Sequence, residues 1–138
     1  MAKHVLTDAS VVLNSVDLSD HVDTVSFVVT IVGQPASAMA DVEDYSMPGL
    51  RKISPITLTM YQDFAASKTY ATLMTLWTNR TSFNCVIKPT SGAAASTNPQ
   101  FTVSVFISSF PVVAAKHGDA HMSNITLEPA GIMTISAP

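Results

Sequence analysis

The sequence predicts a mainly β protein with one flanking α-helix, and three observations carry this prediction. Apolar and polar residues alternate over several short segments, and one further segment repeats apolar residues at helical spacing. The length of 138 residues is that of one domain. We therefore expect a single domain over residues 1–138, a β-barrel or sandwich with one helix and long loops.

The predicted strands are segments in which every second residue is apolar. The clearest covers residues 101–108, where Phe101, Val103, Val105 and Ile107 share one face and mostly hydroxyl side chains occupy the other. A period of two is typical of a half-buried strand. Similar patterns predict strands over residues 25–31, 56–61, 82–88, 122–127 and 132–136.

The outward positions of these strands carry neutral hydroxyl side chains. Exposed strands in a free-standing sheet are usually protected by charge, proline or a bulge. An uncharged outer face is suited to close contact with another chain, so we interpret it as an assembly surface. The residues are Ser26, Thr30, Thr57, Thr59, Thr102, Ser104 and Thr126.

One helix is predicted over about residues 67–79. Tyr70, Leu73, Met74 and Trp77 recur at helical spacing, and Ser67 is placed to act as the N-cap. An apolar stripe of this kind is typical of the face that a helix turns toward the core. We expect the helix to lie across the sheet.

Two long loops are predicted, over residues 33–46 and 89–99. Both are rich in small and polar residues, and both contain glycine and proline. Loops longer than about 12 residues in a compact domain are usually functional or disordered. We expect the first loop, which separates two strong strands, to carry function.

The sequence is poor in charge. Ten acids and seven bases make up 12% of the residues, about half the usual share, whereas 47% are hydrophobic. The longest wholly apolar run, residues 110–115, is far shorter than the roughly 20 residues of a membrane span. We expect no membrane insertion, and a surface covered by partner proteins. The net charge of −3 leaves no basic patch to hold nucleic acid through its phosphates.

No residue pattern indicates catalysis. Residues 117–121 (HGDAH) are the one place where metal-ligand types gather, and the central glycine favours a turn there. Cys85 stands alone in an apolar strand, as a small buried hydrophobe does. The sequence has no nucleophile motif and no phosphate-binding loop. We expect no catalytic residue, metal or cofactor; a small β-barrel enzyme or ligand carrier is a residual alternative.

The order of short motifs along the chain resembles that of the major tail (tail tube) proteins of long-tailed bacteriophages. The opening VLNSVDLSDHV has Ser15 in place of the family's glycine. The passage MPGLRK is followed by a strand and Asp63, and then by the helix. The later matching segments are residues 87–89, 97–99, 118–119, 123–127 and 131–132.

The resemblance implies a tail-tube-type domain that assembles into hexameric rings, which stack into a hollow conduit for genome delivery. It implies a structural protein and not an enzyme. The implied partners are copies of itself, the tape-measure protein, the tail terminator and distal tail or baseplate proteins, with transient, non-specific passage of DNA. A capsid decoration protein, or another non-enzymatic phage structural binding module, is the alternative.

The resemblance also assigns roles to particular residues. The loop over residues 33–46 becomes the inter-ring loop, with Pro35, Met39, Asp41, Glu43, Asp44 and Tyr45 as its interacting residues. An acidic or hydroxyl-lined channel wall would repel phosphate. The candidates for that wall, whose inward orientation the sequence leaves open, are Asp17, Asp20, Asp23, Asp63, Asp119 and Glu128.

We expect the protein to reside in the virion tail after assembly in a bacterial host cytoplasm. The N-terminal residues 1–8 hold no apolar stretch of the length that a secretion signal needs.

Overall fold

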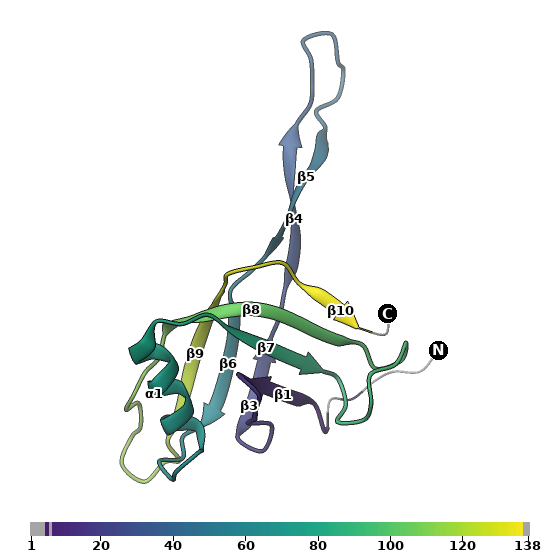
Figure 1. The fold of residues 1–138 in the computed structure, drawn as a ribbon. Helices are drawn as coiled ribbons and strands as arrows, with labels where there is room; N and C mark the ends of the chain where they lie inside the picture. The colour runs from purple at the N-terminus through teal and green to yellow at the C-terminus, as the bar shows by residue number, and fades with distance from the viewer. Residues whose placement is uncertain (1–4, 6, 137–138) are drawn as a thin grey trace.

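The computed structural model describes Val5 and residues 7–136, which form ten strands and one helix (Figure 1). The first residues, on which the expectation of no secretion signal rests, lie largely outside this described part. In chain order the elements are β1 (Ser10–Leu13), β2 (Val16–Asp17), β3 (Val22–Ser26), β4 (Val29–Pro35), β5 (Ser46–Ile53), β6 (Ile56–Tyr61), α1 (Thr69–Asn79), β7 (Phe83–Lys88), β8 (Gln100–Ser109), β9 (Met122–Pro129) and β10 (Thr134–Ser136).

One antiparallel sheet forms the body of the molecule. Its strand order is β2-β1-β7-β8-β9-β6-β3, and β10 pairs with the first part of β8. The sheet curves, so that residues of β1, β2 and β3, at its two edges, line the same groove. β4 and β5 pair only with each other, as a separate two-stranded sheet. The prediction of a mainly β protein is confirmed.

The core lies on the concave side of the sheet. Along β6, Ile56, Leu58 and Met60 are fully buried, while the alternate residues face outward. Val103 and Val105 of β8 occupy the same core. Alternation therefore predicted these strands because one of their faces is buried and the other is not.

Cys85 belongs to this core, as its sequence context predicted. Its side chain is fully buried among apolar neighbours on β7. Burial without a charged partner disfavours the thiolate, and it raises the pKa of the Cys85 thiol to about 12. The thiol is therefore a packing group.

The helix lies within two residues of its predicted limits, but its buried face differs from the prediction. Thr69, Leu73 and Leu76 are buried, whereas Trp77 is 56% exposed. The hydroxyl of Thr69 accepts a hydrogen bond from the Asp63 N–H at 2.8 Å, which fixes this side of the helix against the body. The predicted stripe that ends at Trp77 is therefore turned partly toward solvent.

The predicted N-cap at Ser67 is wrong. Ser67 has a φ of 61°, and Lys68 occupies the cap position without a side-chain hydrogen bond to the helix. The first turn is instead tied to the preceding loop, since Tyr70 N–H donates to the Asp63 carbonyl at 3.2 Å. The start of this helix is therefore held by hydrogen bonds to the preceding loop and not by a side-chain cap.

The predicted strand over residues 25–31 is two strands. β3 pairs with β6 as far as Ser26, and pairing resumes in β4 and β5 at Val29 opposite Ile53. Pro55 lies at this junction, and a proline has no N–H to continue the ladder. The predicted loop over residues 33–46 is correspondingly shorter, because residues 33–35 and 46 belong to strands and only residues 36–45 form the turn.

The second long loop, residues 89–99, is confirmed and is organised by one side chain. Asn98 is buried, its amide nitrogen lies 3.0 Å from the Gly92 carbonyl, and its amide oxygen accepts the Thr90 N–H at 3.0 Å. The predicted turn at residues 117–121 is also present, with Gly118 at a φ of 91°. The strand predicted over residues 132–136 is limited to β10.

Candidate assembly surfaces

The clearest candidate for an interaction surface is the β4–β5 hairpin. We call β4, the turn of residues 36–45 and β5 together the arm. The arm continues the β3–β6 pair beyond the body and projects from it as a narrow two-stranded ribbon (Figure 1). All seven residues of β4 are exposed.

The arm is apolar although it is exposed. Met39 and Val42, in the turn, are completely exposed, and Leu50 on β5 is 84% exposed. Exposed apolar groups gathered on one element are uncommon in monomers and mark interaction sites. The other large apolar side chains that are exposed on the arm are Val29, Ile31, Val32, Tyr45 and Met47.

The turn of the arm has a defined shape. Ser37 Oγ accepts the Tyr45 N–H at 2.7 Å and donates to the Asp44 carboxylate, while the Ala36 N–H donates to the Tyr45 carbonyl at 3.1 Å. The Asp41 carboxylate accepts the Ala38 N–H. The six predicted interacting residues, Pro35, Met39, Asp41, Glu43, Asp44 and Tyr45, are all exposed at this end of the arm.

The arm is irregular at one place. Its pairing register shifts between Ile31 and Gly33, and Gly49 lies across from this irregularity. A Cβ atom on Gly49 would lie 2.5 Å from the Val32 carbonyl oxygen, whereas one on Gly33 would meet Ser46 Cβ at 3.5 Å. The close approach of the two backbones therefore requires glycine at position 49 but not at position 33.

The acids predicted to line a channel fall into two groups. Asp17, Asp20 and Asp23 line the groove between the two edges of the sheet, and Asp63 is joined to Asp20 through His21. Asp119 and Glu128 lie elsewhere. Asp119 is in the turn before β9, and Glu128 is on β9 opposite Phe106.

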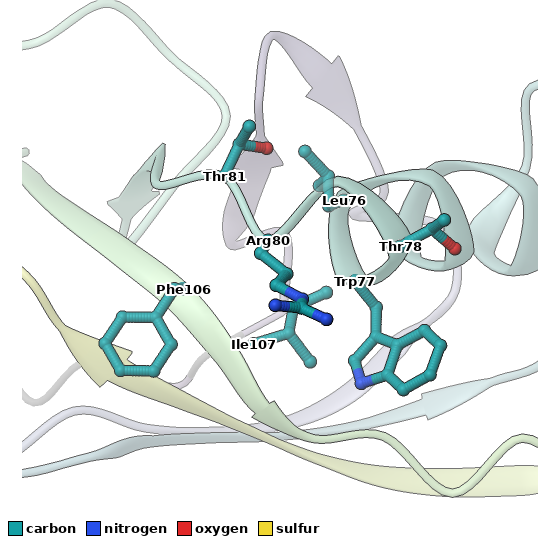
Figure 2. Close-up of a pocket in the computed structure, with 7 residues that line it drawn as sticks. All are labelled: Leu76, Trp77, Thr78, Arg80, Thr81, Phe106 and Ile107. Carbon is teal, nitrogen blue, oxygen red and sulfur yellow. The ribbon is translucent and has the colours of Figure 1, made fainter.

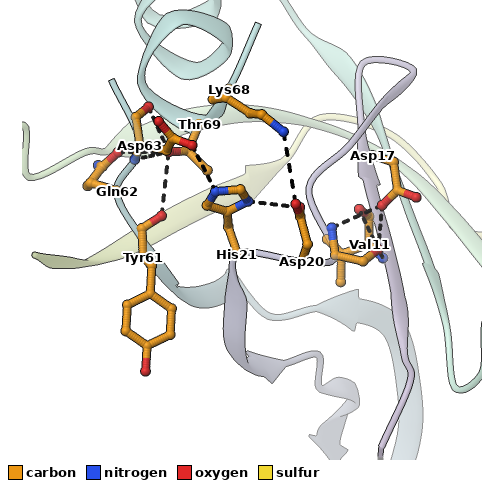
Figure 3. A network of polar contacts seen from close by, with 10 residues as sticks. Val11, Asp17, Asp20, His21, Tyr61, Gln62, Asp63, Lys68 and Thr69 are labelled. Carbon is orange, nitrogen blue, oxygen red and sulfur yellow. Dashed lines mark hydrogen bonds and ion pairs between the residues drawn. The ribbon is translucent and has the colours of Figure 1, made fainter. Parts of the chain in front are cut away.

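His21 lies between two of these carboxylates (Figure 3). Its Nδ1 lies 2.8 Å from Asp20 Oδ1, and its Nε2 lies 3.1 Å from Asp63 Oδ2. The hydrogen bond to Asp20, with that to Asp63, raises the pKa of His21. The hydrogen bond from His21 lowers the pKa of Asp20, and the Ala65 N–H, more than His21, lowers the pKa of Asp63. The cluster joins the loop before β3 to the loop before α1.

Asp17 and Ser19 form a second local contact. The Asp17 carboxylate accepts the Ser19 N–H at 2.9 Å and the Ser19 hydroxyl, and Ser19 Oγ in turn accepts the Val11 N–H at 2.8 Å. Asp17 and Asp20 are therefore bound within the body, and their charges are partly compensated.

Neutral polar side chains cover the outer face of three adjacent strands. Pairing places Thr24 of β3 opposite Thr59 of β6, and Thr59 donates to the Asn124 side chain of β9 at 2.7 Å. The next cross-strand row, formed by Ser26, Thr57 and Thr126, also consists of hydroxyl side chains. We call this surface the hydroxyl face; it consists of Thr24, Ser26, Thr57, Thr59, Asn124 and Thr126.

A groove lies between the end of α1 and β8, where the sequence predicts no site. Its walls include Trp77, Arg80 and Phe106 (Figure 2). Phe106 is 41% exposed. Its outward position could have been found from the alternation of residues 101–108, which places it opposite the buried face. Helical spacing places Trp77 on the predicted core stripe, so the sequence gives no sign of its exposed position.

The described residues contain no group of three or more His, Cys, Asp or Glu side chains placed to hold a metal ion. His121, part of the only candidate segment, accepts the Ala114 N–H at 3.0 Å and stacks on Phe64. In the same part of the chain, no helix is long and apolar enough to cross a membrane.

Comparison with known proteins finds similarity in structure alone. No protein-family model and no curated protein sequence matches the chain. A chain from the virion of a native gene transfer agent particle superposes with a TM-score of 0.73 at 11% identity, covering 94% of this chain and 96% of that one. The chain has a tail-tube-like fold. The resemblance inferred from the sequence motifs is thus confirmed as a likeness of fold.

Two further structures support this assignment. A chain from the sheath/tube terminator of PVC, an extracellular contractile injection system, in its extended state, has a TM-score of 0.73 at 16% identity, with 99% of both chains covered. The Hcp protein has a TM-score of 0.53 at 10% identity, with 94% of this chain and 98% of that chain covered. The predicted fold class is therefore confirmed.

Substitution of Gly49 by alanine will loosen the arm without affecting the body. The new methyl group must displace the Val32 backbone, which costs about 1–3 kcal/mol, so amide hydrogen exchange in β4 and β5 should speed up by about tenfold or more. Gly33→Ala is the matched control and should leave exchange unchanged. Equal exchange in both variants would show that the close approach at Gly49 does not hold the arm together.

The His21 cluster makes the stability of the body depend on pH. Because the folded-state pKa of His21 is raised, its stabilisation is complete below the ordinary value of 6.5 and is lost as the pH rises through the raised value. The carboxylates, whose pKa values are lowered from 3.8, contribute above 3.8 and lose their contribution as the pH falls through the lowered values.

His21→Gln should therefore lower the thermal unfolding midpoint more at about pH 5.5 than at about pH 8.5. His117→Gln, in the exposed turn before β9, is the control and should show no such difference. An equal effect of His21→Gln at both pH values would contradict the ion pairing described here.

Proposed function

We propose that this chain is a structural subunit of the tail tube of a phage-like particle, in which hexameric rings stack into a hollow conduit for genome delivery. The observation that carries the proposal is the exposed apolar arm on a body of tail-tube-like fold. The body is closed over its own core, whereas the arm buries little of its apolar surface within its own chain.

The dimensions of the arm suit a contact between rings. The seven residues of β4 extend about 23 Å at the usual rise of a strand, and they carry the turn away from the body (Figure 1). The ordered turn at its end carries the residues that we propose for inter-ring contact: Pro35, Met39, Asp41, Glu43, Asp44 and Tyr45.

The hydroxyl face is our proposed lining of the channel, together with the acids predicted from the sequence. A conduit must not bind the phosphates of DNA, and a neutral or acidic wall offers them no counter-charge. Among the six acids, Asp23, Asp119 and Glu128 lie outside the His21 cluster and the Asp17–Ser19 contact, so they would contribute most to repulsion. Asp17, Asp20 and Asp63 would contribute less.

The tube function implies the proposed partners. Copies of this chain would form the rings, and the tape-measure protein, the tail terminator and distal tail or baseplate proteins would contact the tube. The particle's tail is the proposed location.

A tube terminator is a second candidate for the same fold. It is favoured by the likeness to a chain in the terminator structure of an injection system, where both chains are covered almost completely. A terminator would form a ring that does not stack further, whereas a tube protein would polymerise.

Negative-stain electron microscopy of the purified protein at high concentration tests the proposal. We expect rings of six subunits, and hollow tubes in which these rings are stacked. Rings that never stack would favour the terminator, and a monomer at every concentration would refute both.

A variant in which an Asn-Gly turn replaces residues 36–45 isolates the role of the arm. This dipeptide suits a two-residue hairpin turn, so the body should keep its thermal unfolding midpoint. We expect rings to form and tubes to be absent; tubes of normal length would remove the arm from the inter-ring contact.

A further inference from the structure

The groove at the end of α1 has the composition of a protein-binding site. Leu76 and Ile107 form its inner part, and the large side chains of Trp77 and Phe106 stand at its sides, 56% and 41% exposed. Figure 2 shows the Arg80 side chain between these two aromatic rings. Aromatic residues and arginine are the types most enriched at the energetic centres of interfaces.

Arg80 is held in this groove by the end of the helix. It has a φ of 53°, in the left-handed region, and its N–H donates to the Trp77 carbonyl at 3.3 Å. Glycine or asparagine fits this position at less conformational cost. Within the described part of the chain, the Arg80 guanidinium forms no ion pair.

The end of the arm has the complementary composition. Asp41, Glu43 and Asp44 place three acids beside the fully exposed Met39 and Val42, and residues 33–50 include no Lys or Arg. The groove thus offers a base between apolar walls, and the turn of the arm offers acids beside apolar side chains. Arginine paired with a carboxylate forms strong, directional hydrogen bonds when water is excluded.

We propose that the groove of Leu76, Trp77, Arg80 and Phe106 receives the turn of the arm from a second copy of this chain. The contact is between copies, because the arm and α1 lie at opposite ends of the molecule (Figure 1). Glu43 is the proposed partner of Arg80, since Asp41 and Asp44 already accept hydrogen bonds within the turn. The inference rests on the proposed tube function and specifies which surface the arm binds.

Reciprocal charge reversal tests the pairing. Arg80→Glu and Glu43→Arg should each raise the protein concentration needed for tube assembly by about tenfold or more, since like charges then face each other. The double variant Arg80→Glu/Glu43→Arg should assemble nearly as the natural sequence does. Lys116→Glu, an exposed base outside the groove, is the control and should assemble normally.

Normal assembly of both single variants, or failure of the double variant to recover, would overturn the pairing. Each variant is also compared with the natural sequence by its thermal unfolding midpoint, so that a defect in folding is recognised.

Cross-linking separates the failure of this contact from the failure of the tube. Thr81 also lines the groove, beside Arg80. Val42→Cys and Thr81→Cys proteins are mixed and oxidised, and the native Cys85 does not compete because it is buried with a raised pKa. We expect disulfide-linked pairs that contain one chain of each kind. Val42→Cys mixed with Thr24→Cys, on the hydroxyl face, is the control and should give none.

Tubes without the Val42–Thr81 cross-link would refute this contact and leave the tube function intact. Cross-linked pairs without rings or tubes would support the contact and refute the tube.

Discussion

The molecule depends on two chain segments that pair with each other twice, first at the edge of the main sheet and again outside it. As β3 and β6, the two chain segments contribute to the core, with Leu58 fully buried. Past Pro55 the same two segments pair again as β4 and β5, where the apolar residues have no body to cover them. The first half stabilises the subunit, and the second half is left for another protein.

The positions of the few charged residues explain where the surface of the subunit is left neutral. Several carboxylates are bound within the subunit, since Asp20 and Asp63 hold His21, and Asp17 holds Ser19. The outer face of β3, β6 and β9 is left with hydroxyl and amide groups. A subunit built this way has a surface suited to neighbours of its own kind and a neutral face suited to a channel. The missing charge is thus compatible with both proposed surfaces.

Much of the body could be predicted from the sequence because one face of each main strand is buried. Alternation located β6, β8 and β9, and helical spacing located α1. Alternation over residues 25–31 predicted only the start of the arm, since alternation reports burial and neither face of β4 is buried. Gly33 and Pro35 therefore resembled loop residues, although they pair with β5.

The sites were harder to predict because they depend on contacts between distant residues. His21 and Asp63 are 42 positions apart, and no local pattern brings them together. The groove at Trp77 depends on which face of α1 turns inward, and contacts of that face with the body, such as the hydrogen bond at Thr69 and the burial of Leu73, are tertiary. The acids of the arm were found from sequence because they stand in a polar segment, but their shared turn geometry was not.

Assembly should cover the apolar arm. Amide hydrogen exchange of residues 29–53, compared between dilute subunits and assembled material, tests this, with β6 as the internal reference because its backbone is paired with β3 and β9 in both states. We predict strong protection of the arm on assembly and little change in β6. Assemblies in which the arm exchanges as fast as in the free subunit would show that assembly leaves the arm uncovered.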